Sequence, residues 1–128
     1  MTRREIMTRV RAQALLVRRL DEQMKELGGD GVRSLRLGGA PGGNYAAGRG
    51  LDVRMERKDA LERMMTRESA RLAEYEKAAR REMEEMKPGE YAFCLMYYIE
   101  ARTLKETSMA IDRSVRQCER YRSLIGGA

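Results

Sequence analysis

The chain has 128 residues, of which 36% are charged and 5% aromatic, and its formal net charge is +6. So few aromatic side chains argue against a large globular core, and so many charges favour long exposed helices. Basic side chains outnumber acidic ones by 7 to 4 in residues 1–27 and by 6 to 3 in residues 101–128, against 10 to 11 in residues 51–90. Two basic ends are compatible with a polyanionic partner.

No apolar run approaches the roughly 20 residues of a membrane span, and the short run AQALLV lies among arginines, unlike a secretory signal. We therefore expect a cytoplasmic protein without a membrane partner. The two cysteines, Cys94 and Cys118, occupy apolar positions of expected helices, and the chain has no histidine. We expect both thiols to be buried and reduced, with no metal site and no cofactor.

Residues 3–27 are expected to form the first helix. Its apolar positions alternate in steps of four and three, which is the heptad pattern of packed helices, and Gln13 fills the one polar gap. This seam consists of Ile6, Val10, Val17, Leu20, Met24 and Leu27. The glycines after Leu27 are expected to end the helix, because glycine tolerates the left-handed conformation of a C-cap.

Residues 28–50 hold nine of the twelve glycines, together with Pro41 and Asn44. This composition predicts a flexible linker. The stretch GGAPGGNYAAGRG superficially resembles a phosphate-binding loop. It lacks a preceding strand and a following Gly-Lys-Ser/Thr, so we prefer the linker interpretation.

Residues 51–86 are expected to form a second, longer helix with the same four-three spacing. Its seam consists of Leu61, Met65, Leu72, Tyr75, Ala79 and Met86, with Glu68 and Glu82 as polar interruptions. Two such seams imply two helices packed on each other, most simply as an antiparallel hairpin. The helix-breaking stretch KPGE at residues 87–90 then separates a hairpin domain, residues 1–86, from a second domain, residues 87–128.

Three short helices are expected in the last segment, over residues 89–101, 104–111 and 115–125. Two of them begin with a capping-box pattern, a hydroxyl residue followed three positions later by Glu or Gln. These pairs are Thr103 with Glu106 and Ser114 with Gln117. Two short helices joined by a bend of about three residues have the layout of a helix-turn-helix. The expected fold class is therefore all-α, a long antiparallel hairpin plus a helix-turn-helix bundle.

The last helix has two different faces. Cys118, Tyr121 and Ile125 recur at three-four spacing and should face the bundle, with Val115 on the same side. The opposite side carries arginines and one glutamine, which can bind guanine, adenine or phosphate. The predicted DNA-binding residues are Thr103, Arg113, Ser114, Arg116, Gln117 and Arg120. Thr103 is placed where its hydroxyl or backbone amide can bind a phosphate.

The stretch YYIEARTLKETSMAIDRSVRQCERY, residues 97–121, resembles the C-terminal segment of small phage and prophage regulators of Gram-positive bacteria. These RinA/ArpU-type relatives have a helix-turn-helix like region four of sigma-70-type factors. The matching positions are Tyr98, Ile99, Thr103, Glu106, Ser114, Arg116, Gln117 and Arg120, with Leu104 at the family's Trp and Cys118 at its Val. The resemblance implies a regulator that binds double-stranded DNA.

The chain departs from that family pattern at four further positions. Asp112 stands at the turn glycine, Thr107 and Ser108 replace Ile-Ala, and Tyr97 replaces an arginine. Asp112 accepts a left-handed conformation less readily than glycine. Polar residues at 107 and 108 weaken the buried face of their helix.

The leading hypothesis is a sequence-specific transcriptional regulator of phage or prophage type, located in the cytoplasm of a bacterial host. Its hairpin then serves as a homodimer interface or as a contact for RNA polymerase. The alternative is a phage structural or assembly protein, such as a small terminase subunit, which also combines a helix-turn-helix with long helices but forms a ring. We do not expect an enzyme, because the sequence has no histidine and no paired carboxylates in a plausible pocket.

Overall fold

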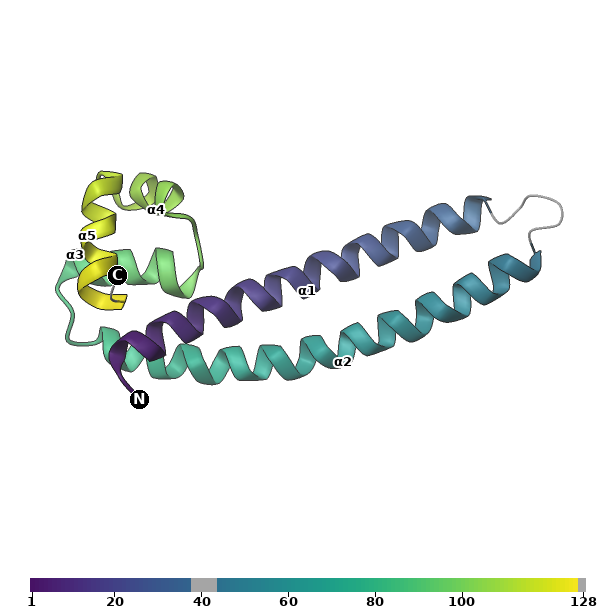
Figure 1. Ribbon diagram of the computed structural model, residues 1–128, viewed down its shortest axis with the longest axis horizontal. Helices are drawn as coiled ribbons and strands as arrows, with labels where there is room; N and C mark the ends of the chain where they lie inside the picture. Colours follow the sequence, from purple (N-terminus) through teal and green to yellow (C-terminus); the bar gives the residue numbers. More distant parts are fainter. Residues whose placement is uncertain (38–43, 127–128) are drawn as a thin grey trace. The chain divides into compact units, whose positions relative to one another are not determined.

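The computed structural model describes the backbone of residues 1–37 and 44–126 and the side chains of residues 1–27 and 53–126. All regular structure in that part of the chain is helical, which confirms the predicted all-α class. Figure 1 labels the α-helices α1 (Arg3–Leu37), α2 (Asn44–Met83), α3 (Pro88–Cys94), α4 (Leu104–Ile111) and α5 (Val115–Gly126). The π-helix η1 (Leu95–Ile99) directly follows α3. None of the described helices is long and apolar enough to cross a membrane.

The two long helices extend further into the glycine-rich stretch than predicted. The expected end at Leu27 is wrong, because α1 continues to Leu37, and the expected start at residue 51 is wrong, because α2 begins at Asn44. A helical glycine costs only about 1 kcal/mol relative to alanine, so scattered glycines lower helix stability without ending a helix. The rest of the predicted linker, residues 38–43, lies outside the described residues.

The chain divides into two compact units. Unit 1 contains Met1–Leu16 and Ser69–Ala128, and unit 2 contains Val17–Glu68. The predicted domain boundary after residue 86 therefore falls inside unit 1, although α2 does end near it, at Met83. Pro88 occupies the first turn of α3, where its missing N–H removes no helical hydrogen bond.

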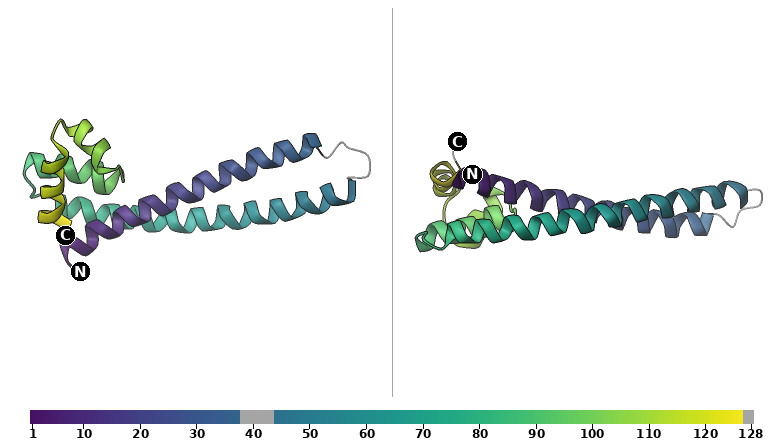
Figure 2. Two further views of the ribbon diagram at one scale, coloured as in Figure 1. Left: turned by 45° about the horizontal axis from the view of Figure 1, so that its top comes forward. Right: turned by 90° about the horizontal axis from the view of Figure 1, so that it is seen from below.

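In unit 1 the first turns of α1 run antiparallel to the last turns of α2 (Figure 2). Arg3 Nε lies 3.3 Å from Glu82 Oε2, and the Arg9 guanidinium lies 5.5 Å from the centre of the Tyr75 ring. These pairs join an early residue of α1 to a late residue of α2 in reverse order. The predicted antiparallel hairpin is thus present in this unit.

One apolar core joins the two long helices to the C-terminal helices within unit 1. Its buried members are Met7, Val10, Ala79, Met83, Phe93, Cys94, Tyr98, Ile99, Cys118 and Ile125. Val10 and Ala79 belong to the predicted heptad seams, whereas Met7 and Met83, both fully buried, do not. A heptad seam describes packing on one side of a helix, whereas the start of α1 also packs on the C-terminal helices.

In unit 2 the described parts of α1 and α2 keep the predicted seam. Leu20 is buried, while Val17, Met24, Leu61 and Met65 are half-buried. The predicted polar interruption, Glu68, is itself only 5% exposed, and its carboxylate pairs with Arg67 Nε at 3.2 Å. A buried carboxylate must keep charged or hydrogen-bonding partners. Glu68 therefore favours one register of α1 against α2.

Both cysteines are free and buried, as predicted. Burial raises the pKa of the Cys94 thiol to about 12, helped by the nearby Glu90 carboxylate, and burial also raises the pKa of Cys118. The Cys94 thiol donates a hydrogen bond to the Met86 sulfur at 3.5 Å. Neutral thiols of this kind pack as small apolar side chains and react slowly.

Replacement of Leu20 by aspartate is expected to destabilise the helix pair by several kcal/mol, roughly 3 or more, because it introduces an unpaired charge at a buried position. Thermal and denaturant unfolding followed by circular dichroism measures the loss. Leu16→Asp is the matched control, since Leu16 is 37% exposed and Leu20 only 4%. Equal losses in the two variants would contradict the seam.

The free energy of unfolding is expected to fall as the pH rises above about 9. Cys94 and Tyr98 each have a folded-state pKa raised to about 12, from ordinary values of 9.0 and 10.0, with burial as the largest cause. Folding therefore favours the neutral forms, so this stability is complete below pH 9 and is lost as the unfolded-state groups ionise. Denaturant titrations between pH 7 and pH 10.5 measure the slope, and Cys94→Ala should reduce it.

Candidate nucleic-acid interface

The helix-turn-helix begins with a complete capping box at Thr103. The Thr103 hydroxyl accepts a hydrogen bond from the Glu106 amide, and the Glu106 carboxylate accepts one from the Thr103 amide, both at 3.1 Å. This arrangement satisfies two amides that the first turn of a helix leaves without partners. The structure therefore confirms the predicted start of α4, and its end at Ile111 as well.

The turn between α4 and α5 consists of Asp112, Arg113 and Ser114. Asp112 has φ 55° and ψ 48°, which is a left-handed conformation. Its amide donates to the Ser108 carbonyl, which ends α4. Ser114 then caps α5, because its hydroxyl accepts a hydrogen bond from the Gln117 amide at 3.1 Å. The two helices thus have the predicted lengths and the predicted short bend.

The inner face of α5 is the predicted one, with one exception. Cys118 and Ile125 are buried and Tyr121 is half-buried. Val115 was predicted on this side as well, but its side chain is 40% exposed. The difference follows from its place in the first turn of α5, beside the exposed turn, where the core no longer covers the helix.

The outer face of α5 and the turn before it carry the predicted arginines. Arg113, Arg116 and Arg120 are exposed, and Gln117 is half-buried at the border of this face. The three guanidinium groups form no hydrogen bond or ion pair with other described residues. Arg116 and Arg120 line a shallow hollow together with Glu119, Ser123 and Leu124. Among the described residues that line this hollow, Glu119 is the one carboxylate, against two arginines.

The first turn of α4 differs from the prediction in one detail. The Thr103 amide is taken by Glu106, so of the two groups predicted to hold a phosphate only the hydroxyl remains. That hydroxyl accepts one hydrogen bond and keeps its own proton for donation. The exposed side chain of Lys105 places a cation at this helix start, and it was not among the predicted DNA-binding residues. Its position two residues after the N-cap could have indicated a cation close to a bound phosphate.

Aromatic packing fixes α5 on the rest of unit 1. The Phe93 ring lies 5.2 Å from the ring of Tyr97, 5.9 Å from that of Tyr98 and 5.6 Å from that of Tyr121, measured between centroids. Such contacts are geometrically specific and add stability beyond the area that they bury. At the end of α5, a β-carbon on Gly126 would lie 2.0 Å from the Tyr98 hydroxyl, so any larger residue would have to displace the Tyr98 side chain. The packing of the inner face of α5 therefore determines the orientation of its arginine face.

No protein-family model, curated protein or solved structure matches the chain. The resemblance of residues 97–121 to RinA/ArpU-type regulators therefore stays a prediction. Within the described residues, no cluster of three or more His, Cys, Asp or Glu side chains is arranged to hold a metal ion.

Thr107→Val is expected to stabilise the helix-turn-helix by about 1 kcal/mol, because the Thr107 hydroxyl is buried without a hydrogen-bond partner and valine has the same shape. Thr103→Val is the opposite control and should destabilise by about 1 kcal/mol through loss of the cap. Denaturant unfolding of both variants measures the change in the free energy of unfolding, which should be positive for Thr107→Val and negative for Thr103→Val. A destabilised Thr107→Val protein would indicate that the hydroxyl is in fact satisfied.

Proposed function

We propose that this chain is a sequence-specific DNA-binding transcriptional regulator that reads duplex DNA with α5. The observation that carries the proposal is the exposed arginine face of α5, directly after the turn of a helix-turn-helix. In known proteins with this layout the second helix of the pair lies in the major groove. The resemblance to phage and prophage regulators supports the same function.

The electrostatics of this face favour a polyanion. Arg113, Arg116 and Arg120 have no carboxylate partner among the described residues, so binding a phosphate or a base edge would break no existing ion pair. Guanidinium groups bind guanine and phosphate through two parallel hydrogen bonds. The face can therefore gain charge-assisted contacts without first losing internal ones.

The six proposed DNA contacts have different roles. Arg116 and Gln117 lie in the first turn of α5, where recognition helices approach base edges. Arg120 lies one turn further on and reaches either a base or a phosphate. The sugar–phosphate backbone is held by Arg113 and Ser114 in the turn and by Thr103 before α4. These contacts fix the register of the protein on the duplex without reading its sequence.

The proposal extends to two further partners. Homodimerisation through the helical hairpin would place two recognition helices on two half-sites. Contact with RNA polymerase is the second, since sigma-region-four-like units bind the polymerase as well as DNA.

Sedimentation equilibrium separates the regulator from an assembly protein of the small terminase type. A monomer or dimer fits a regulator, whereas a closed ring of many subunits fits a packaging component.

The test begins with selection of bound duplexes from a random pool by the purified chain, which should enrich one short motif. On that motif, Arg116→Ala and Gln117→Ala should each lose about 1–3 kcal/mol and relax the preference at particular base pairs. Arg113→Ala should weaken binding to every sequence alike and reduce the salt dependence by about one unit of slope. Salt titrations on the selected and on a scrambled duplex measure both signatures.

Arg80→Ala is the matched control, because it removes the same charge from an exposed position of α2. It should leave the sequence preference and most of the affinity unchanged. If the α5 variants behave like this control, the arginine face of α5 does not contact DNA and the regulator proposal fails.

A further inference from the structure

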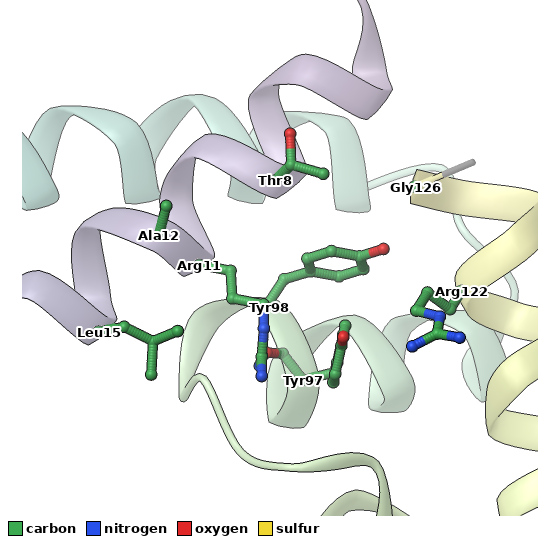
Figure 3. Close-up of a pocket in the computed structure, with 8 residues that line it drawn as sticks. All are labelled: Thr8, Arg11, Ala12, Leu15, Tyr97, Tyr98, Arg122 and Gly126. Atoms are coloured by element: carbon green, nitrogen blue, oxygen red, sulfur yellow. The ribbon is translucent and has the colours of Figure 1, made fainter. Parts of the chain in front are cut away.

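Arg11 of α1 reaches across a groove to the end of the π-helix η1 (Figure 3). Its guanidinium lies 3.9 Å from the centre of the Tyr97 ring. The Nη1 atom donates hydrogen bonds to two backbone carbonyls, those of Tyr97 and, at 2.7 Å, of Arg102. One nitrogen thus bridges two points of the chain that lie on either side of a bend.

The residue enclosed by this bridge has an unfavourable conformation. Ala101 has φ 53°, in the left-handed region that glycine normally occupies at the end of a helix. For an alanine this conformation costs about 1–2 kcal/mol. A conformation of this kind persists only where surrounding contacts determine it.

The π-helix explains why carbonyls are available at this point. The Glu100 amide bonds back to the Leu95 carbonyl, and the Arg102 amide bonds to the Met96 carbonyl. The Tyr97 carbonyl instead accepts the Arg11 guanidinium, so a side chain from α1 completes the end of η1. Cationic side chains satisfy terminal carbonyls of helices in the same way.

The bend at Ala101 sets the start of the helix-turn-helix. Arg102, whose carbonyl Arg11 holds, directly precedes Thr103, the N-cap of α4. A change of φ at Ala101 would swing Thr103 and α4 away from α3 and η1, against which α4 now packs. The Arg11 bridge therefore lies directly before the residue that begins α4.

We infer that Arg11 is a positioning residue, which holds the left-handed bend at Ala101 and thereby keeps α4 and α5 in the arrangement that binds DNA. The DNA-binding part of this inference rests on the proposed function, whereas the structural part does not. Arg11 touches no DNA in this role. It acts through the backbone of residues 97–102.

Removal of the Arg11 side chain should therefore have a smaller effect on α4 and on DNA affinity when residue 101 is glycine. Glycine adopts positive φ without penalty and does not need the bridge. The experiment is a double-mutant cycle of Arg11→Ala and Ala101→Gly in the full chain. Each effect of Arg11→Ala is measured within one background, so the buried methyl that Ala101→Gly removes cancels.

Two readouts are used below the unfolding temperature. The first is hydrogen exchange at the amides of Glu106 and Thr107, which bond to the Thr103 hydroxyl and carbonyl. The second is affinity for the selected duplex and for a scrambled one. Arg11→Ala should accelerate exchange and weaken specific binding by about tenfold when residue 101 is alanine, the size expected from the left-handed penalty. With glycine at 101, the losses should shrink to about threefold or less.

Arg9→Ala is the matched control, since Arg9 lies half a turn away on α1 and stacks on Tyr75 of α2 instead. It should change neither readout by more than about twofold. If Arg11→Ala does not fold, Arg11→Lys is used in both backgrounds, because it keeps a cationic donor and should show a smaller loss with the same dependence on residue 101.

Equal losses in the alanine and glycine backgrounds, or unchanged exchange in Arg11→Ala, would overturn the inference, because Arg11 would then only anchor α1. Failure of the proposed function is a separate result. If the wild-type chain binds no duplex, the exchange cycle still decides the role of Arg11. If it binds and the cycle shows no coupling, the DNA-binding proposal stands without Arg11.

Discussion

The structure of unit 1 depends on one apolar core that the C-terminal helices share with the two long helices. Residues 87–128 form a segment of about 40 residues, and segments of that size rarely bury enough apolar surface to fold alone. α1 supplies Met7 and Val10, and α2 supplies Ala79 and Met83. The helix-turn-helix is therefore one end of a larger packing unit, and its exposed face is determined by what its inner face must cover.

This dependence explains how a chain with few aromatic residues holds α5 in one orientation. Four of its seven aromatic side chains, one Phe and three Tyr, meet around Phe93. Aliphatic side chains at the same place would bury similar area with less directional preference. The close approach of the Tyr98 hydroxyl to Gly126 adds a steric limit at the far end of α5. The arginine face then points outward because the opposite face has one well-defined place to pack.

The sequence predicted those features that depend on residues close together in the chain. The cap at Thr103 needs only a hydroxyl and a carboxylate three residues apart, and it was located to the residue. The heptad seam found Leu20 and Val10 for the same reason. The predicted end of α1 and the predicted start of α2 were wrong, because glycine content reports a local cost and leaves out the stability of the helices on either side. The contact of Arg11 with the Tyr97 carbonyl joins residues 86 positions apart, so no local pattern predicts it.

Among the described residues, several departures from regular geometry lie just before α4 or within it, and the left-handed Asp112 directly follows it. They include the π-helix from Leu95 to Ile99, the left-handed Ala101 and the unpaired hydroxyl of Thr107. Each is unfavourable by itself, and a chain selected for stability alone would remove them by ordinary substitutions. Such departures are expected where function restricts the structure. Here they adjoin the helices that carry the arginine face, and they bear most directly on how α4 packs against α3 and η1.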